Sequence, residues 1–248
     1  MRLPDQLYLK REPRPLLADF FLAADRFAAE RGVLLSISTD FDELRAVNRR
    51  NRDSWVPLLP SISTDYNDMR EHAAFWLKGV GEADGDVVLA RACRLYDLPA
   101  NKTMHDALVD LSLFYDASHW IRPFEHLAST ALVPRAITGR FVMSVGGWHH
   151  PSVRKLNLSA GAPRIVRAWA HNEWSPPLFT SFVEDHLAEK ARRAYGIRNQ
   201  ETGITWSGCP AVEELTVTLF WMTPGQLLES LAAFLAETTS ERQRELAA

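Results

Sequence analysis

The chain is organised around one stretch, Gly146-Gly147-Trp148-His149-His150-Pro151-Ser152-Val153-Arg154-Lys155-Leu156-Asn157-Leu158-Ser159. Residues 141–145 precede it as a β-forming run, a turn is expected at Pro151, and a helical pattern opens near Pro163. A strand, a turn and a helix in this order aim backbone N–H groups and a helix N-terminus at an anionic ligand. Two glycines late in a strand indicate a bulge, or the close approach of another backbone or a ligand. We therefore expect a ligand to lie along this strand.

Composition limits what the chain can be. Its 248 residues, 46% of them hydrophobic, suffice for one large core. Twenty-eight basic and 31 acidic residues give a net charge of −3, which argues against a general nucleic-acid-binding protein. We expect a single mixed domain that binds neither nucleic acid nor a membrane.

Cysteine usage and the N-terminus suggest a compartment. The two cysteines, Cys93 and Cys209, are too few for a disulfide framework or a zinc site, and they fit a reducing environment. No apolar run approaches the roughly 20 residues that span a bilayer. Residues 1–5 lack the apolar core of a signal peptide. These features predict a soluble cytoplasmic protein.

Upstream of the central stretch, the pattern predicts helices and antiparallel strands. An amphipathic helix is expected to begin at Pro15 and to stop at Gly32, and a strand is expected over 33–38. Asp40 opens a second helix, and Thr103 caps a third. Strands over 74–80 and 86–95 form a hairpin around an Asp-Gly turn, and 116–137 is interpreted as a structured loop.

Downstream, strands alternate with helices. Residues 178–183 read as a buried strand, 184–195 as a helix closed by Gly196, and 202–206 as another strand. Residues 215–221 alternate cleanly between apolar and polar, and Thr223 caps a final helix. Hairpins followed by alternating strands and helices predict one mixed α/β sheet, an α+β arrangement.

From about residue 33 to residue 207 this order resembles the GNAT superfamily of acyl-CoA-dependent N-acyltransferases. In that family the loop after the bulged central strand commonly reads Val-x-Pro-x-x-Arg-Gly-x-Gly-Leu-Gly/Ala and binds the pyrophosphate of the cofactor. Residues 148–159 align with it without a gap. Matching positions are Pro151, Arg154, Leu158 and Ser159, whereas Lys155 and Asn157 stand where the family has glycines.

The resemblance implies a set of cofactor-binding residues for acetyl-CoA or another acyl-CoA as co-substrate: Gly147, Trp148, Arg154, Lys155, Leu156, Asn157, Leu158 and Ser159. Asn157 tolerates a left-handed backbone better than most residues. Lys155 suits such a backbone less well, but its charge can itself face a phosphate. The alternative is a Lys155 that points to solvent beside a loop that holds no ligand.

The resemblance also implies a tyrosine that protonates the departing thiolate. The aligned position holds Arg192, and Tyr195 follows one helical turn later. Two interpretations of Tyr195 stay open, a general acid and a half-buried wall residue.

A general base must deprotonate the attacking ammonium. His149 and His150 lie beside the expected thioester, alternation puts one of them on the ligand face, and imidazole titrates in the useful range. Both are equally well interpreted as strand-end histidines that hydrogen-bond the turn. Glu173 is a further, weaker candidate. No His-Glu-x-x-His pair or supporting cysteine is present, so no metal is expected.

We therefore expect a GNAT-like domain over 33–207, preceded by an N-terminal extension and helix (1–32) and followed by a strand and helix (208–248) packed on the same domain. The expected function is transfer of an acetyl or other acyl group to an amine carried by a small molecule or peptide. Two alternatives remain: a catalytically silent ligand-binding protein, and an interaction module whose amphipathic terminal helices form a homodimer. Lys155, Asn157 and Arg192 are the positions that separate these alternatives from an active enzyme.

Overall fold

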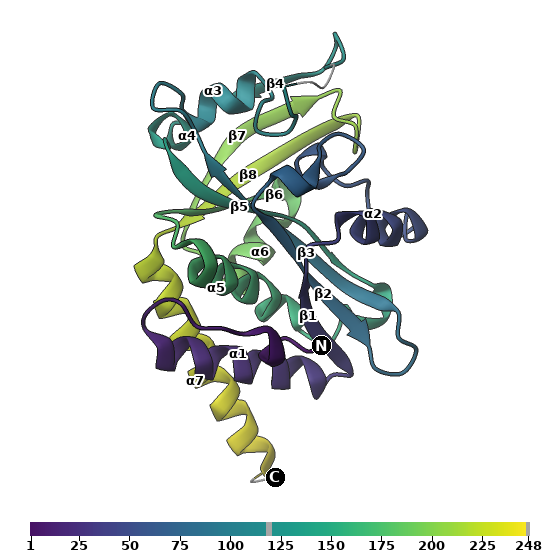
Figure 1. Ribbon diagram of the computed structural model, residues 1–248, viewed down its shortest axis with the longest axis vertical. Helices are drawn as coiled ribbons and strands as arrows, with labels where there is room; N and C mark the ends of the chain where they lie inside the picture. The colour runs from purple at the N-terminus through teal and green to yellow at the C-terminus, as the bar shows by residue number, and fades with distance from the viewer. Residues whose placement is uncertain (118–120, 247–248) are drawn as a thin grey trace.

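A mixed sheet forms the centre of the protein (Figure 1). The computed structural model describes residues 1–117 and 121–246. Within them the strands lie in the order β1-β2-β3-β5-β6-β8-β7-β4. Their bounds are β1 Val33–Ser38, β2 Ala74–Gly81, β3 Val87–Asp97, β4 His126–Ser129, β5 Arg140–His149, β6 Phe179–Glu184, β7 Asn199–Ser207 and β8 Glu214–Met222. The predicted mixed α/β class is confirmed.

One parallel contact interrupts an otherwise antiparallel sheet. Strands β5 and β6 run parallel and pair only over 142–144 and 179–181. Beyond that point β5 continues along β3 to His149, whereas β6 continues along β8 to Glu184. The two strands thus part in the middle of the sheet.

Helices cover both faces of the sheet and enclose two hydrophobic clusters (Figure 1). One face carries α1 (Arg14–Ala29), α5 (Ala162–Trp174) and α7 (Pro224–Leu246). The other carries α2 (Phe41–Arg50), α3 (Met104–Val109) and the connector 51–73. Two shorter helices are α4 (Val133–Ala136) and α6 (Ala188–Tyr195). Phe75, Trp76 and Leu77 of β2 alternate between the two clusters, as the pleat requires.

Local sequence signals account for several helix ends. The Asp40 side chain accepts a hydrogen bond from Glu43 N at 2.8 Å, and Thr103 forms a reciprocal capping box with Asp106. Gly196 ends α6 at φ +63°, a left-handed angle that glycine adopts without a steric penalty. The predicted caps at Asp40 and Thr103 and the predicted stop at Gly196 are confirmed.

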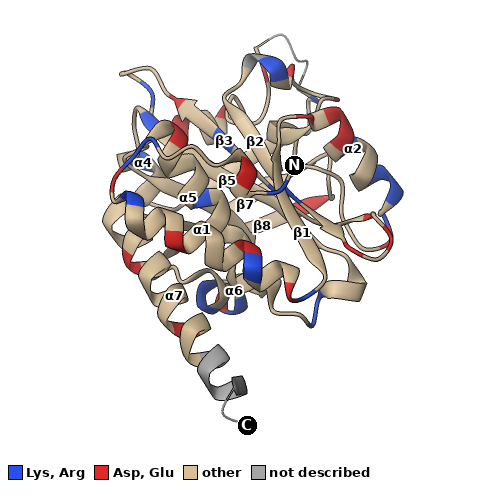
Figure 2. Cartoon of the chain, turned by 60° about the horizontal axis from the view of Figure 1, so that its bottom comes forward, with Lys and Arg blue, Asp and Glu red and all other residues tan. Residues whose placement is uncertain are grey.

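Charges of both signs are interspersed along α1 and α2, and α6 carries a cluster of basic residues (Figure 2). In the part of the chain that the structure describes, no helix combines the length and the apolarity needed to span a membrane.

One segment differs from the pattern seen in the sequence. The segment 116–137, interpreted as a loop, contains β4 and α4 in its described part, and residues 118–120 lie outside the described residues. The boundaries 1–32, 33–207 and 208–248 stay a prediction.

Candidate functional site

A cavity of about 160 Å³ lies where β5 and β6 part. Its walls come from residues 145–147 of β5, residues 182–184 at the end of β6, and the connector 55–59. Arg91 of β3 and Tyr195 of α6 add the polar part of the lining. The opening thus brings together backbone from two diverging strands, one guanidinium and one phenol.

The two glycines shape this cavity in different ways. Opposite Arg91 the register of β3 and β5 shifts, because Ala92 pairs with Val145 and Ala90 with Trp148. Gly146 takes φ +66° in this bulge, and a Cβ there would lie 2.5 Å from Ile62 Cδ1. A Cβ at Gly147 would lie 2.7 Å from Arg91 Nη1. The expected bulge is present, and the space above Gly147 holds a guanidinium of this same chain.

Arg91 is held by two neutral partners. Its Nε donates to Ser144 Oγ at 2.8 Å, and its Nη1 donates to Tyr195 Oη at 3.1 Å. The guanidinium carbon lies 4.6 Å from the centre of the Tyr195 ring, so the charge also meets the face of the ring. Arg91 is only 4% exposed.

These contacts change the acidity of Tyr195. Burial alone would raise the pKa of this phenol, but the Arg91 charge, the hydrogen bond from Arg91 and the Arg167 charge outweigh burial and hold the pKa below its ordinary value. Arg167 of α5 is 1% exposed, and burial with the charges of Arg91 and Arg164 lowers its pKa to about 9. Arg167 therefore stays charged at neutral pH. A phenol next to two cations is a better proton donor than a free tyrosine.

The two histidines have separate surroundings. His149 Nε2 is buried without a hydrogen-bond partner among the described residues. Burial, followed by the charges of Arg91 and Arg154, lowers the pKa of His149 to about 4, so the ring is neutral at pH 7. His150 Nδ1 lies 2.7 Å from Ser152 Oγ and caps the turn that follows. Neither ring lines the cavity.

Two carboxylates near the central strand differ in position. Glu173, near the end of α5, pairs with Lys10 of the N-terminal segment and is not part of the cavity lining. Glu184, at the end of β6, does line the cavity, and its side chain is 42% exposed. No sequence motif marks Glu184, because only the parting of the strands gives it this position.

The loop after β5 closes on itself. Two 3₁₀ turns, Pro151–Val153 and Leu158–Ala160, direct the N–H groups of Val153, Arg154, Leu156, Ala160 and Gly161 to carbonyls of the same loop. Asn157 between the turns has φ +55°, the left-handed angle that its side chain tolerates. Lys155 and Asn157 are exposed, Leu156 and Ser159 are partly buried, and Leu158 is buried.

Trp148 and Arg154 tie this loop to the opposite wall. Trp148 stacks on Trp55 with ring centres 4.7 Å apart, and its Nε1 donates to Ser54 Oγ at 3.2 Å. Arg154 donates from Nε to His149 O and from Nη2 to Ser54 O, both at 3.1 Å. Of the expected cofactor-binding residues, only Gly147 lines the cavity.

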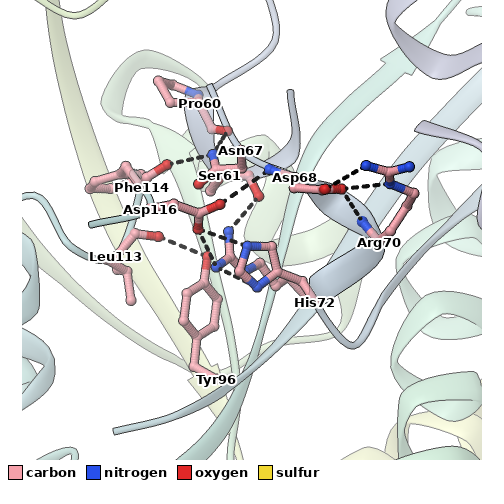
Figure 3. A network of polar contacts seen from close by, with 11 residues as sticks. Pro60, Ser61, Asn67, Asp68, Arg70, His72, Tyr96, Leu113, Phe114 and Asp116 are labelled. Atoms are coloured by element: carbon pink, nitrogen blue, oxygen red, sulfur yellow. Dashed lines mark hydrogen bonds and ion pairs between the residues drawn. The ribbon is translucent and has the colours of Figure 1, made fainter. Parts of the chain in front are cut away.

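A polar network on the face of the sheet that carries α2 and α3 holds the connector 51–73 in place (Figure 3). His72 Nε2 contacts Asp116 Oδ1 at 2.8 Å, and Asp68 N donates to Asp116 Oδ2 at 3.1 Å. Asn67 Nδ2 donates to Phe114 O at 2.9 Å. The network anchors residues 60–72, which follow the cavity wall formed by 55–59. Over the described ranges no group of three or more His, Cys, Asp or Glu side chains is placed to hold a metal ion.

Sequence reasoning missed Arg91, Arg167 and Glu184. A signal was present for Arg91, because it stands in the middle of the strand sequence Val-Val-Leu-Ala-Arg-Ala-Cys, where a charge is unusual unless it has a buried role. Arg167 occupies a position of α5 whose neighbours are almost all buried.

Comparisons with known proteins bear on the fold alone. No protein-family model and no curated protein matches the chain. Solved structures that it resembles include FeeM, an N-acyl amino acid synthase from uncultured soil microbes, with TM-score 0.46, 9% identity, and 79% of this chain and 92% of that one covered. Another is the aminoglycoside acetyltransferase AAC(6')-Ib in complex with coenzyme A and kanamycin, with TM-score 0.41, 13% identity and coverage of 78% and 96%. A GNAT-family acetyltransferase from Bacillus anthracis has TM-score 0.38, 9% identity and coverage of 77% and 94%.

All three TM-scores are below 0.5, so the fold class rests on the strand order of the chain itself. Strand, helix, antiparallel strands, a bulged central strand, and then a helix, a strand, a helix and a strand occur in the order that the resemblance predicts, with α3, β4 and α4 inserted between β3 and β5. The chain thus has a GNAT-like mixed α/β fold.

Proposed function

We propose that this protein transfers an acyl group from an acyl-CoA thioester to an amine in the cavity between β5 and β6. The observation that carries the proposal is that Tyr195 lines the opening between two diverging strands, beside the bulge at Gly146. A thioester in this opening would lie along strand backbone, and Arg91 would keep the phenol acidic.

The chemistry assigns a role to each side chain. The amine nitrogen attacks the thioester carbonyl carbon, the carbon–sulfur bond breaks, and Tyr195 gives its proton to the departing sulfur. Glu184 takes a proton from the amine, and exchange with water restores both groups. Arg91 stabilises the negative charge that Tyr195 carries after it has given its proton.

The test is acyl transfer from acetyl-CoA to a panel of amines by the purified full-length chain. Tyr195→Phe keeps the ring and removes the proton donor, so kcat should fall by about 10²-fold or more with little change in KM. Tyr8→Phe is the matched control, because Tyr8 is 75% exposed. If both variants retain full activity, Tyr195 is not the acid.

A silent acyl-CoA-binding protein is the second candidate, and the closed loop favours it. Five N–H groups of the loop are directed to carbonyls of the same loop, and Arg154 is bound to backbone oxygens. Calorimetry with millimolar coenzyme A separates the cases. Binding without transfer to any amine supports the silent protein, and the absence of binding contradicts both candidates.

A further inference from the structure

Arg91 brings a charge into the cavity, and its two hydrogen-bond partners satisfy that charge only in part. A guanidinium has five N–H donors, and its hydrogen bonds to Ser144 and Tyr195 use two of them. Both partners are neutral hydroxyl groups. Among the described residues no carboxylate lies within 4 Å of Arg91, although only 4% of its surface reaches solvent.

The neighbouring helix adds positive charge instead of compensating it. Arg167 is 1% exposed, donates to Tyr195 O and Met222 Sδ, and leaves Nη2 buried without a partner in the described part of the chain. Arg164 is 6% exposed and donates to carbonyl and hydroxyl oxygens only. Buried charges cost several kcal/mol each unless a counter-charge meets them. Two buried cations, Arg91 and Arg167, therefore act on Tyr195, and neither has a carboxylate within 4 Å among the described residues.

We propose that Arg91 binds a carboxylate carried by the substrate, which docks at the inner end of the cavity opposite the bulge. This inference rests on the proposed acyl transfer and narrows its substrate class. The carboxylate belongs either to the acyl group, as in a dicarboxylic acyl-CoA, or to the acceptor, as in an amino acid. Both sources offer the planar, two-oxygen acceptor that the remaining guanidinium N–H donors match.

The cavity favours a carboxylate over a phosphate. Its lining is largely apolar, with Trp55, Phe182 and Leu215 among its walls, and its volume of about 160 Å³ suits a short apolar chain with one charged end. Glu184 is the acidic residue of the lining, and it lies at the end of β6, 42% exposed. An acceptor with both an amino group and a carboxylate would find an opposite charge for each.

Matched substrate pairs test the proposal on the full-length protein. Succinyl-CoA and butyryl-CoA differ at one end of a four-carbon chain, where a carboxylate replaces a methyl group. Alanine and alaninamide differ by the acceptor carboxylate, with acetyl-CoA as donor. In one of the two pairs the carboxylated member should have a kcat/KM about tenfold or more higher. Arg91→Met should bring that ratio near unity, Arg91→Lys should keep part of it, and Arg140→Met, an exposed arginine of β5, should leave it unchanged.

A titration followed by nuclear magnetic resonance tests carboxylate binding by Arg91 directly, without turnover. The ¹⁵Nε resonance of Arg91 in the wild-type protein should shift and saturate with sodium succinate and stay in place with succinamide. This titration needs neither a folded Arg91→Met variant nor a bound acyl-CoA. If no acyl-CoA binds but succinate shifts the resonance, the proposed acyl transfer is wrong and the carboxylate site is supported. Absence of both a pair preference and a succinate shift overturns the proposal. It is equally overturned if inorganic phosphate shifts the resonance at lower concentration than succinate does.

Discussion

Replacing Gly146 by alanine tests the bulge on which the cavity depends. Gly146 has φ +66°, and a Cβ there would lie 2.5 Å from Ile62 Cδ1. Ile62 is fully buried in the second hydrophobic cluster, so its side chain has little room to move. Two penalties therefore act together, one from the backbone and one from crowding.

The magnitude follows from these two penalties. A left-handed alanine costs about 1–2 kcal/mol, and the smaller freedom of the unfolded chain returns about 0.4–1 kcal/mol. Overpacking against Ile62 adds about 1–3 kcal/mol. We expect Gly146→Ala to lower the free energy of unfolding by about 2–3 kcal/mol, which is about 4–12 °C in Tm for a chain of this length.

The assay is urea unfolding, in which the variants and the wild-type protein should have equal m values. Gly85→Ala is the matched control. Gly85 has φ +75° and nothing within 4 Å of an added Cβ, so it reports the backbone penalty alone, about 1 kcal/mol. Ile62→Val removes the crowding methyl group, and in that background Gly146→Ala should cost about as much as Gly85→Ala. Equal losses for Gly146→Ala and Gly85→Ala in the wild-type background would refute the crowding argument.

Three further predictions concern charge and loop geometry. The pKa of His149 is lowered in the folded state to about 4, so the unfolded chain binds the extra proton as the pH falls from about 6.5 to 4, and up to about 3 kcal/mol of stability is lost across that window. His149→Asn should flatten the pH dependence of urea unfolding; an unchanged slope contradicts the burial argument. Arg91→Met should raise the pKa of Tyr195, measured by ultraviolet titration of the phenol, because it removes a cation that lowers this pKa; an unchanged or lower pKa would show that Arg91 does not lower it. Asn157→Ala should destabilise the protein to urea by about 1 kcal/mol at its left-handed angle, and Asn157→Gly should not; identical values would remove the backbone explanation.

Much of the fold could be predicted from the sequence because the signals are local. Strand β1 has the predicted bounds 33–38, and β2 and β3 extend the predicted hairpin by only a few residues. The segment 126–136 could not be read in this way, since β4 is four residues long and α4 has proline at its start. Such short elements owe their structure to their neighbours more than to their own pattern.

The candidate site, like the fold, has one part that the sequence predicts and one part that it does not. The two glycines and the turn after them predict an irregular central strand, because glycine readily adopts the backbone angles that a bulge requires. The resemblance in residues 148–159 directs attention to the loop that follows. Those features belong to the chain before it folds.

Only the tertiary structure decides what the irregular strand is for. Arg91, Glu184 and Tyr195 stand 93 and 11 positions apart in the sequence, and they meet because β5 and β6 separate after three paired residues. Arg91 fills the space above Gly147, a contact that depends on the register of β3 against the bulge. Register and strand divergence are set by packing across the whole sheet. A local pattern therefore predicts the bulge but not the guanidinium that lies above Gly147.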